Sequence, residues 1–189
     1  MITLKPWLLN ILACPIDKHH PLEAYFYSWE TSDEELEKIN KDAGKISPHF
    51  KKQYGHLATQ IEDGTISLDA IKEVRDMTES KHSADLYLDV KKFIEKMEYE
   101  EDKSGANLLS RYPEGMDVMY RYLNLVEVEE GIIRCPECGR WYPIGSAVET
   151  IPELMPDDLR EEERDMVFLR KWESKLPVEV ISKGKPFSL

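Results

Sequence analysis

The residues best suited to chemistry are three cysteines that are spaced unevenly along the chain. Cys135 and Cys138 form a Cys-x-x-Cys pair followed by Gly139, whereas Cys14 stands alone near the start. Two thiolates three positions apart, in a turn that glycine allows to bend, point at one tetrahedral metal centre. Asp17 follows Cys14 at the spacing at which Cys138 follows Cys135. This pattern predicts two similar turns, called knuckles below, that meet at one site.

A tetrahedral zinc site needs a fourth donor besides the three thiolates. Zinc accepts carboxylate oxygen and imidazole nitrogen, so Asp17, His19 and His20 are all admissible ligands. Zinc held by three cysteines and one of these residues is the first hypothesis. Two alternatives stay open: knuckles without metal that are held by packing alone, and a structural disulfide among the cysteines. A thioredoxin-type redox pair is disfavoured, because the Cys-x-x-Cys pair lies between strand-like segments.

Composition narrows the class of protein. The 189 residues include 37 acidic and 25 basic side chains, a net charge of −12, which disfavours direct binding to nucleic acid because phosphate affinity needs clustered Lys and Arg. A hydrophobic content of 41% is enough for a packed core. The apolar run near the start is too short to span a membrane and lacks a signal-cleavage pattern. Three cysteines are too few for a disulfide scaffold, which favours a reducing compartment. Together these features lead us to expect a cytoplasmic protein with no membrane partner.

Both flanks of the long gap between the cysteines have the composition of β-sheet. Residues 21–27 are rich in β-forming side chains and predict a strand. Leu123–Val128 and Gly131–Arg134 predict two strands joined by a hairpin turn at Glu129-Glu130-Gly131. Ala147–Leu154 predicts another strand. We therefore expect residues 1–29 and 123–156 to form one small zinc-ribbon-like β domain from both ends of the chain.

The segment between these flanks has helical periodicity. Ser32 and Glu35 form a capping box, and Ser47, Ser67 and Ser83 precede further apolar stripes with helical spacing. Such stripes must be buried against one another, so residues 30–122 are expected to form an inserted helical domain. Residues 157–189 are expected to add a C-terminal helix and, at 178–181, a short strand. The predicted fold class is α+β.

An apolar cluster follows the second knuckle. It is formed by Trp141, Tyr142, Ile144, Val148 and Ile151, on a short segment that a small ribbon can hardly enclose. Exposed apolar strand edges are liabilities unless a partner covers them, so these five residues are the candidate partner-binding surface. The alternative is that the helical domain or the C-terminal helix covers them.

The residues around the cysteines resemble a known family. The similarity lies in Leu8–Pro15, Pro21-Leu22, Val126–Gly131 and Arg134–Ile144. These stretches look like the small zinc-binding activator subunit shared by several S-adenosylmethionine-dependent methyltransferases, which modify tRNA, rRNA and translation release factors. Residue by residue, the metal ligands of that family fall on Cys14, Cys135 and Cys138. Asp17 stands where the family has a fourth cysteine.

The resemblance implies a non-catalytic subunit that stabilises and activates a methyltransferase as a heterodimer. In such complexes a strand of the zinc domain adds to the edge of the enzyme's sheet. S-adenosylmethionine and nucleic acid would be bound only through the partner enzyme. Two other classes of function remain as alternatives: a zinc-ribbon adaptor that binds RNA directly, and a free-standing enzyme, for which the sequence offers no catalytic constellation.

Overall fold

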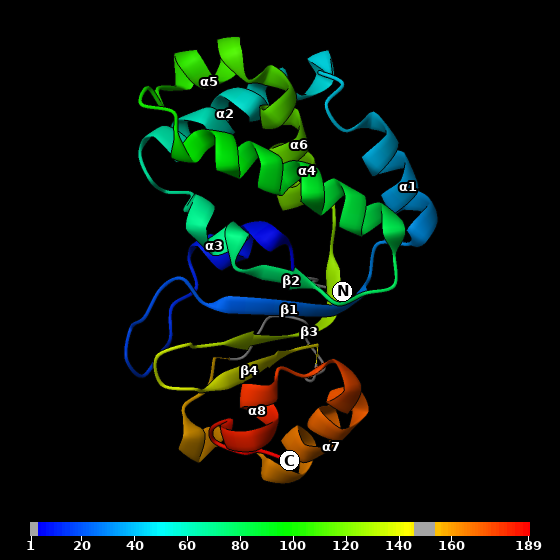
Figure 1. Ribbon diagram of the computed structural model, residues 1–189, viewed down its shortest axis with the longest axis vertical. Helices are drawn as coiled ribbons and strands as arrows, with labels where there is room; N and C mark the ends of the chain where they lie inside the picture. Colours follow the sequence, from blue (N-terminus) through cyan, green and yellow to red (C-terminus); the bar gives the residue numbers. More distant parts are fainter. Residues whose placement is uncertain (1–3, 146–153) are drawn as a thin grey trace.

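The computed structural model describes residues 4–145 and 154–189, and a four-stranded sheet lies in its middle (Figure 1). The strands are β1 (Glu23–Trp29), β2 (Val74–Asp76), β3 (Val128–Arg134) and β4 (Trp141–Ile144), in the order β2-β1-β3-β4. β1 is parallel to β2 and antiparallel to β3, and β3 is antiparallel to β4. The predicted α+β class is confirmed. The segment 30–122, expected to be helical, also contributes the edge strand β2.

A layer of helices covers one face of the sheet. It contains η1 (Pro6–Asn10), α1 (Asp33–Asp42), η2 (Pro48–Phe50), α2 (Lys51–Glu62), α3 (Leu68–Lys72), α4 (Lys81–Glu98), α5 (Gly105–Arg111) and α6 (Pro113–Asn124). The capping box of Ser32 and Glu35 and the N-cap at Ser67 are confirmed. α4 starts after Ser80 rather than at Ser83, because the Ser80 hydroxyl accepts a hydrogen bond from the Ser83 N–H. No helix in the described ranges has the length and apolar run needed to cross a bilayer.

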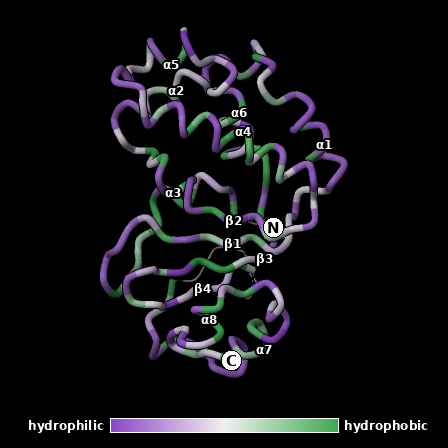
Figure 2. Tube along the Cα trace, viewed as in Figure 1, coloured by the Kyte–Doolittle hydropathy of each residue, from purple (hydrophilic) through white to green (hydrophobic). Residues whose placement is uncertain are grey.

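The sheet is buried on both of its faces. Side chains alternate along a strand, so Ala24 and Phe26 of β1 point into the core shared with the helical layer, whereas Tyr27 points to the opposite side. Hydrophobic positions recur along the strands in Figure 2, and hydrophilic ones dominate the outer surfaces of the helices. Because helices and sheet share one core, the expected division at residues 30 and 122 stays a prediction.

The hairpin turn expected at Glu129-Glu130-Gly131 is wrong. β3 runs without a break through these residues, and Leu123 belongs to α6. Gly131 pairs with Phe26 of β1 on one side and with Ile144 of β4 on the other. A Cβ atom at Gly131 would lie 2.5 Å from the carbonyl oxygen of Tyr25. Glycine is therefore required by the close approach of two central strands and not by a turn.

Residues 154–189 form what we call the C-terminal cap, which covers the second face of the sheet (Figure 1). The cap contains η3 (Asp157–Leu159), α7 (Glu162–Trp172), η4 (Glu173–Lys175) and α8 (Val178–Lys183). The short strand expected at 178–181 is wrong, because this segment is α8. A strand would place Val178 and Val180 on the same side, yet Val178 is 73% exposed and Val180 is fully buried. The strand expected at Ala147–Leu154 falls almost wholly outside the described residues.

Candidate metal centre

The two knuckles have the same backbone hydrogen bonds. The amide four residues after each cysteine donates to the carbonyl of that cysteine, over 2.9 Å from Lys18 to Cys14 and 3.0 Å from Gly139 to Cys135. Each cysteine N–H in turn donates to the carbonyl five residues later, over 3.0 and 2.8 Å. Lys18 and Gly139 both adopt a positive φ, +64° and +74°. The first knuckle thus keeps the backbone of the second, although a lysine replaces the glycine that favours this conformation.

The knuckles bring four side chains together. One ligand atom from each of Cys14, Asp17, Cys135 and Cys138 lies within 4.8 Å of the others. The Sγ atoms of Cys14 and Cys138 are 3.7 Å apart, and the Cys135 Sγ is 3.4 and 3.6 Å from the Asp17 carboxylate oxygens. Around a tetrahedral ion with metal–sulfur bonds of about 2.3 Å, sulfur atoms are separated by about 3.8 Å. The spacing therefore fits a four-coordinate metal ion.

The arrangement bears on two of the points left open by the sequence, the disulfide and the fourth donor. The three thiols are free, and 3.7 Å is far beyond a disulfide bond of about 2.05 Å. Within the described ranges, the cluster takes its fourth donor from Asp17 and not from a histidine. The backbone N–H of His19 donates to Asp17 over 3.0 Å, and His20 Nδ1 is 2.9 Å from the Leu12 carbonyl oxygen. The histidines therefore shape the knuckle around the carboxylate.

Hydrogen bonds and burial set the charges of the cluster. The N–H of His19 lowers the pKa of Asp17 to about 2, so this carboxylate is ionised at neutral pH. Burial opposes ionisation of Cys14, but N–H groups of its own knuckle and the Tyr142 hydroxyl outweigh it and lower the pKa of that thiol. Burial raises the pKa of Cys135 to about 12. Cys135 would therefore have to lose its proton in order to serve as a metal ligand.

Two neighbours of the cluster were not assigned to it from the sequence. The Tyr142 hydroxyl lies 3.5 Å from the Cys14 Sγ. The Arg140 guanidinium binds the Asp157 carboxylate over 2.8 to 3.1 Å, and Asp157 and Cys138 together raise the pKa of Arg140. Strand alternation was the available signal for Tyr142, since it turns this side chain to the face opposite Trp141.

The candidate partner-binding residues are less exposed than expected. Trp141, Tyr142 and Ile144 have exposed fractions of 0, 1 and 0%, as expected from the alternative in which other parts of this chain cover them. The C-terminal cap covers Trp141, and Ile144 belongs to the core beneath the helical layer. Val148 and Ile151 lie outside the described residues.

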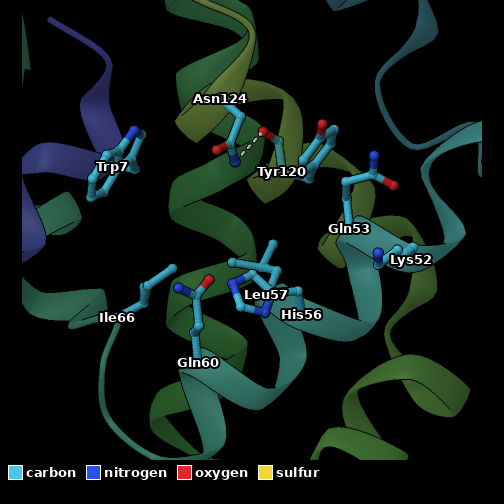
Figure 3. A pocket seen from close by; sticks show the side chains of 9 residues that line it. All are labelled: Trp7, Lys52, Gln53, His56, Leu57, Gln60, Ile66, Tyr120 and Asn124. Atoms are coloured by element: carbon cyan, nitrogen blue, oxygen red, sulfur yellow. Dashed lines mark hydrogen bonds between the residues drawn. The ribbon is translucent and has the colours of Figure 1, made fainter.

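A hollow of about 560 Å³ opens between η1, α2 and α6, apart from the cysteines (Figure 3). Aromatic rings, amides and two basic groups line it; the residues are Trp7, Lys52, Gln53, His56, Leu57, Gln60, Ile66, Tyr120 and Asn124. The Asn124 amide donates to the Tyr120 carbonyl oxygen over 3.1 Å. This lining contains no carboxylate, and hence no paired carboxylates for acid–base chemistry. The cysteine cluster is therefore the better candidate site.

Comparison with models of protein families matches residues 5–145 to the Trm112p-like protein family. The matched range includes both knuckles and all four strands, and it ends directly after β4. The C-terminal cap lies entirely outside it. A search of curated proteins finds no match to the chain.

Proposed function

The chain belongs to the Trm112p-like family, the activator subunits of tRNA, rRNA and release-factor methyltransferases, and from this premise we propose that it binds and activates such an enzyme without catalysing the reaction itself. The observation that carries the proposal is a match over residues 5–145 that contains both knuckles of the metal centre. The partner enzyme binds S-adenosylmethionine and the RNA or protein substrate. A cytoplasmic subunit with a net charge of −12 is suited to that division of labour.

The metal proposed for the cluster is zinc, with Cys14, Asp17, Cys135 and Cys138 as its ligands. Three sulfurs and one carboxylate at tetrahedral spacing are a donor set that zinc accepts. The ion's role is structural: it would tie the first knuckle to the β3–β4 hairpin. Every position of a four-ligand site is then filled by protein, which is typical of structural rather than catalytic zinc.

Replacing Asp17 tests the fourth ligand. We expect Asp17→Ala to weaken zinc binding by at least about tenfold, since losing even an outer-shell partner of a metal ligand costs 10- to 100-fold. Asp17→Cys should retain or exceed the wild-type affinity, because it restores a fourth thiolate. Glu137→Ala removes an exposed acid from the other knuckle and is the matched control. Competition with a chromophoric chelator measures all four affinities, and equal values for Asp17→Ala and Glu137→Ala would rule out Asp17 as a ligand.

The proposed partner surface is the outer edge of β4 together with the residues that follow it, including Val148 and Ile151. A strand added there would gain backbone hydrogen bonds and bury apolar surface, at roughly 25 cal/mol per Å² before association costs. Trp141 belongs to this surface because its backbone lies on the outer edge. Tyr142 and Ile144 are excluded, since they point into the metal centre and the main core.

The activating role is tested with purified components. Candidate methyltransferases are assayed for methyl transfer alone and with this chain, and the thermal stability of each enzyme is followed in parallel. At a concentration 100 times the Kd, the chain should stabilise its partner by about 2.7 kcal/mol and raise its activity. Methyl transfer by the chain alone, or the absence of any effect on every candidate enzyme, would contradict the proposal.

A further inference from the structure

The C-terminal cap is packed on the sheet through a small core of its own. Phe168, Leu169, Leu176 and Val180 of the cap close over Tyr27, Ile132 and Trp141, and this cluster is separate from the main core on the other face. The Phe168 ring stacks on the Trp141 ring with centroids 6.4 Å apart. Because the family match ends before the cap begins, the cap is an addition to the shared fold. It covers a face that the shared fold alone would leave open.

The cap also occupies the outer edge of β4 much as an added strand would. The Trp141 N–H donates to the Lys185 carbonyl over 3.0 Å, and the Lys185 N–H donates to the Gly139 carbonyl over 3.1 Å. Arg140 and Lys185 accordingly form a parallel bridge. The Trp141 indole Nε1 donates to the Phe187 carbonyl over 2.9 Å. These groups are the ones through which a second strand would be bound at this edge.

Arg160 of the cap also contacts the β4 edge at Trp141. Its Nη1 donates to the Trp141 carbonyl oxygen over 2.7 Å, and its guanidinium lies 4.6 Å from the centroid of the indole ring. Its Nε donates to Asp165 over 2.7 Å, and both side chains are almost completely buried. A buried ion pair adds little net stability because both charges lose their water. Both residues belong to the cap, so the pair fixes the Arg160 guanidinium against Trp141 but does not itself join the cap to the sheet.

Some polar atoms buried between the cap and the sheet have no hydrogen-bond partner among the described residues. Tyr27 Oη, Asp165 Oδ1 and Trp172 Nε1 are buried without a hydrogen-bond partner among the residues that the structure describes. Each such group loses its hydration and gains no hydrogen bond in return. The cap therefore gains less from its burial than its apolar area suggests. Such an interface suits a cover that opens while the rest of the fold stays intact.

We propose that the C-terminal cap is an internal competitor of the partner enzyme, and that it must leave the β4 edge before an edge strand of the methyltransferase binds there. The inference rests on the proposed function, because it concerns the same surface. The free chain is then mostly closed. Its apparent affinity for the enzyme is the affinity of the open form multiplied by the fraction of molecules that are open. If about 1 to 10% of molecules are open, a variant whose cap is permanently open should bind the enzyme about 10- to 100-fold more tightly than the wild type.

Two valines of α8 provide a matched pair of variants. Val180→Asp places a carboxylate in the core of the cap, whereas Val178→Asp makes the same change on an exposed position two residues away. We expect Val180→Asp to bind the partner methyltransferase about 10- to 100-fold more tightly than either Val178→Asp or the wild type. A Val180→Asp variant that keeps a protected β1–β3 pair but binds no more tightly would overturn the proposal.

Hydrogen exchange of the free wild-type chain provides a second test that needs no partner. The amides of α7, α8 and Trp141 should exchange through a local opening, well before those of β1 and β3. Exchange of all of them together, by global unfolding, would overturn the proposal whatever the binding data show. Failure of both wild type and Val180→Asp to bind any methyltransferase, with local opening intact, would instead refute the proposed function and the competition that depends on it.

Discussion

Cys135→Ser is expected to abolish zinc binding and to lower the stability of the chain by about 4 kcal/mol at saturating zinc. Cys135 is fully buried and its Sγ lies against both Asp17 and the turn that carries Cys138. A ligand present at a thousand times its Kd stabilises the folded state by about 4.1 kcal/mol, and that contribution disappears with the site. For a chain of this length the melting temperature should fall by roughly 8 to 16 °C. Thermal unfolding and elemental analysis measure the two effects.

The same experiment has an internal control. Treating the wild-type chain with a strong chelator should lower its stability to about the level of Cys135→Ser, while the variant should be insensitive to the chelator. The sheet and its helical layer should persist in both cases, because the main core extends from the knuckles up to α4 and α6. One equivalent of zinc in purified Cys135→Ser, or a wild-type chain indifferent to chelator, would contradict the assigned site.

Gly131→Ala is expected to destabilise the fold by about 3 kcal/mol, the upper end of the cost of overpacking a core. The new Cβ would lie 2.5 Å from the Tyr25 carbonyl oxygen and 3.3 Å from the Ile144 side chain. The contact with Tyr25 is to backbone, so β1 and β3 must move apart at the centre of the sheet. Denaturation in urea measures the change.

Gly55→Ala is the matched control for this prediction. Gly55 lies within α2, and a Cβ there would meet nothing within 4 Å. Alanine is favoured over glycine inside a helix, so this variant should gain roughly 0.5 to 1 kcal/mol. If the two variants were equally stable, the close approach of strands at Gly131 would not be the reason for its glycine.

The sequence predicted the parts of the fold that depend on local chemistry. The helix starts at Ser32 and Ser67 could be predicted because a capping side chain accepts a hydrogen bond from a backbone N–H only three residues away. The Cys-x-x-Cys spacing and its counterpart at Cys14 and Asp17 are local in the same sense. The structure adds that both knuckles share one hydrogen-bond pattern, which is why an aspartate takes the place of a cysteine without rearranging the turn.

The errors arise where a distant segment decides the outcome. Glu129-Glu130-Gly131 has the composition of a turn. Glycine is needed at position 131, however, because the carbonyl of Tyr25, more than a hundred residues earlier, leaves no room for a Cβ atom. The β-branched residues of α8 suggest a strand, but helical spacing is what brings Val180 onto Trp141. Trp141 has the sequence context of an exposed strand edge and is nevertheless covered by the C-terminal cap. Local patterns cannot reveal such pairings, because the burial of one segment depends on where another is placed.

The central claim is that this chain is a subunit of a methyltransferase, and co-production of the two proteins tests it most directly. Tagged chain and untagged candidate enzyme are produced together, and the purified sample is analysed by native mass spectrometry with zinc retained. The predicted result is a one-to-one complex that transfers methyl groups from S-adenosylmethionine, with the enzyme alone poorly soluble or poorly active. A chain that purifies free of every candidate methyltransferase, and changes the activity of none, would contradict it.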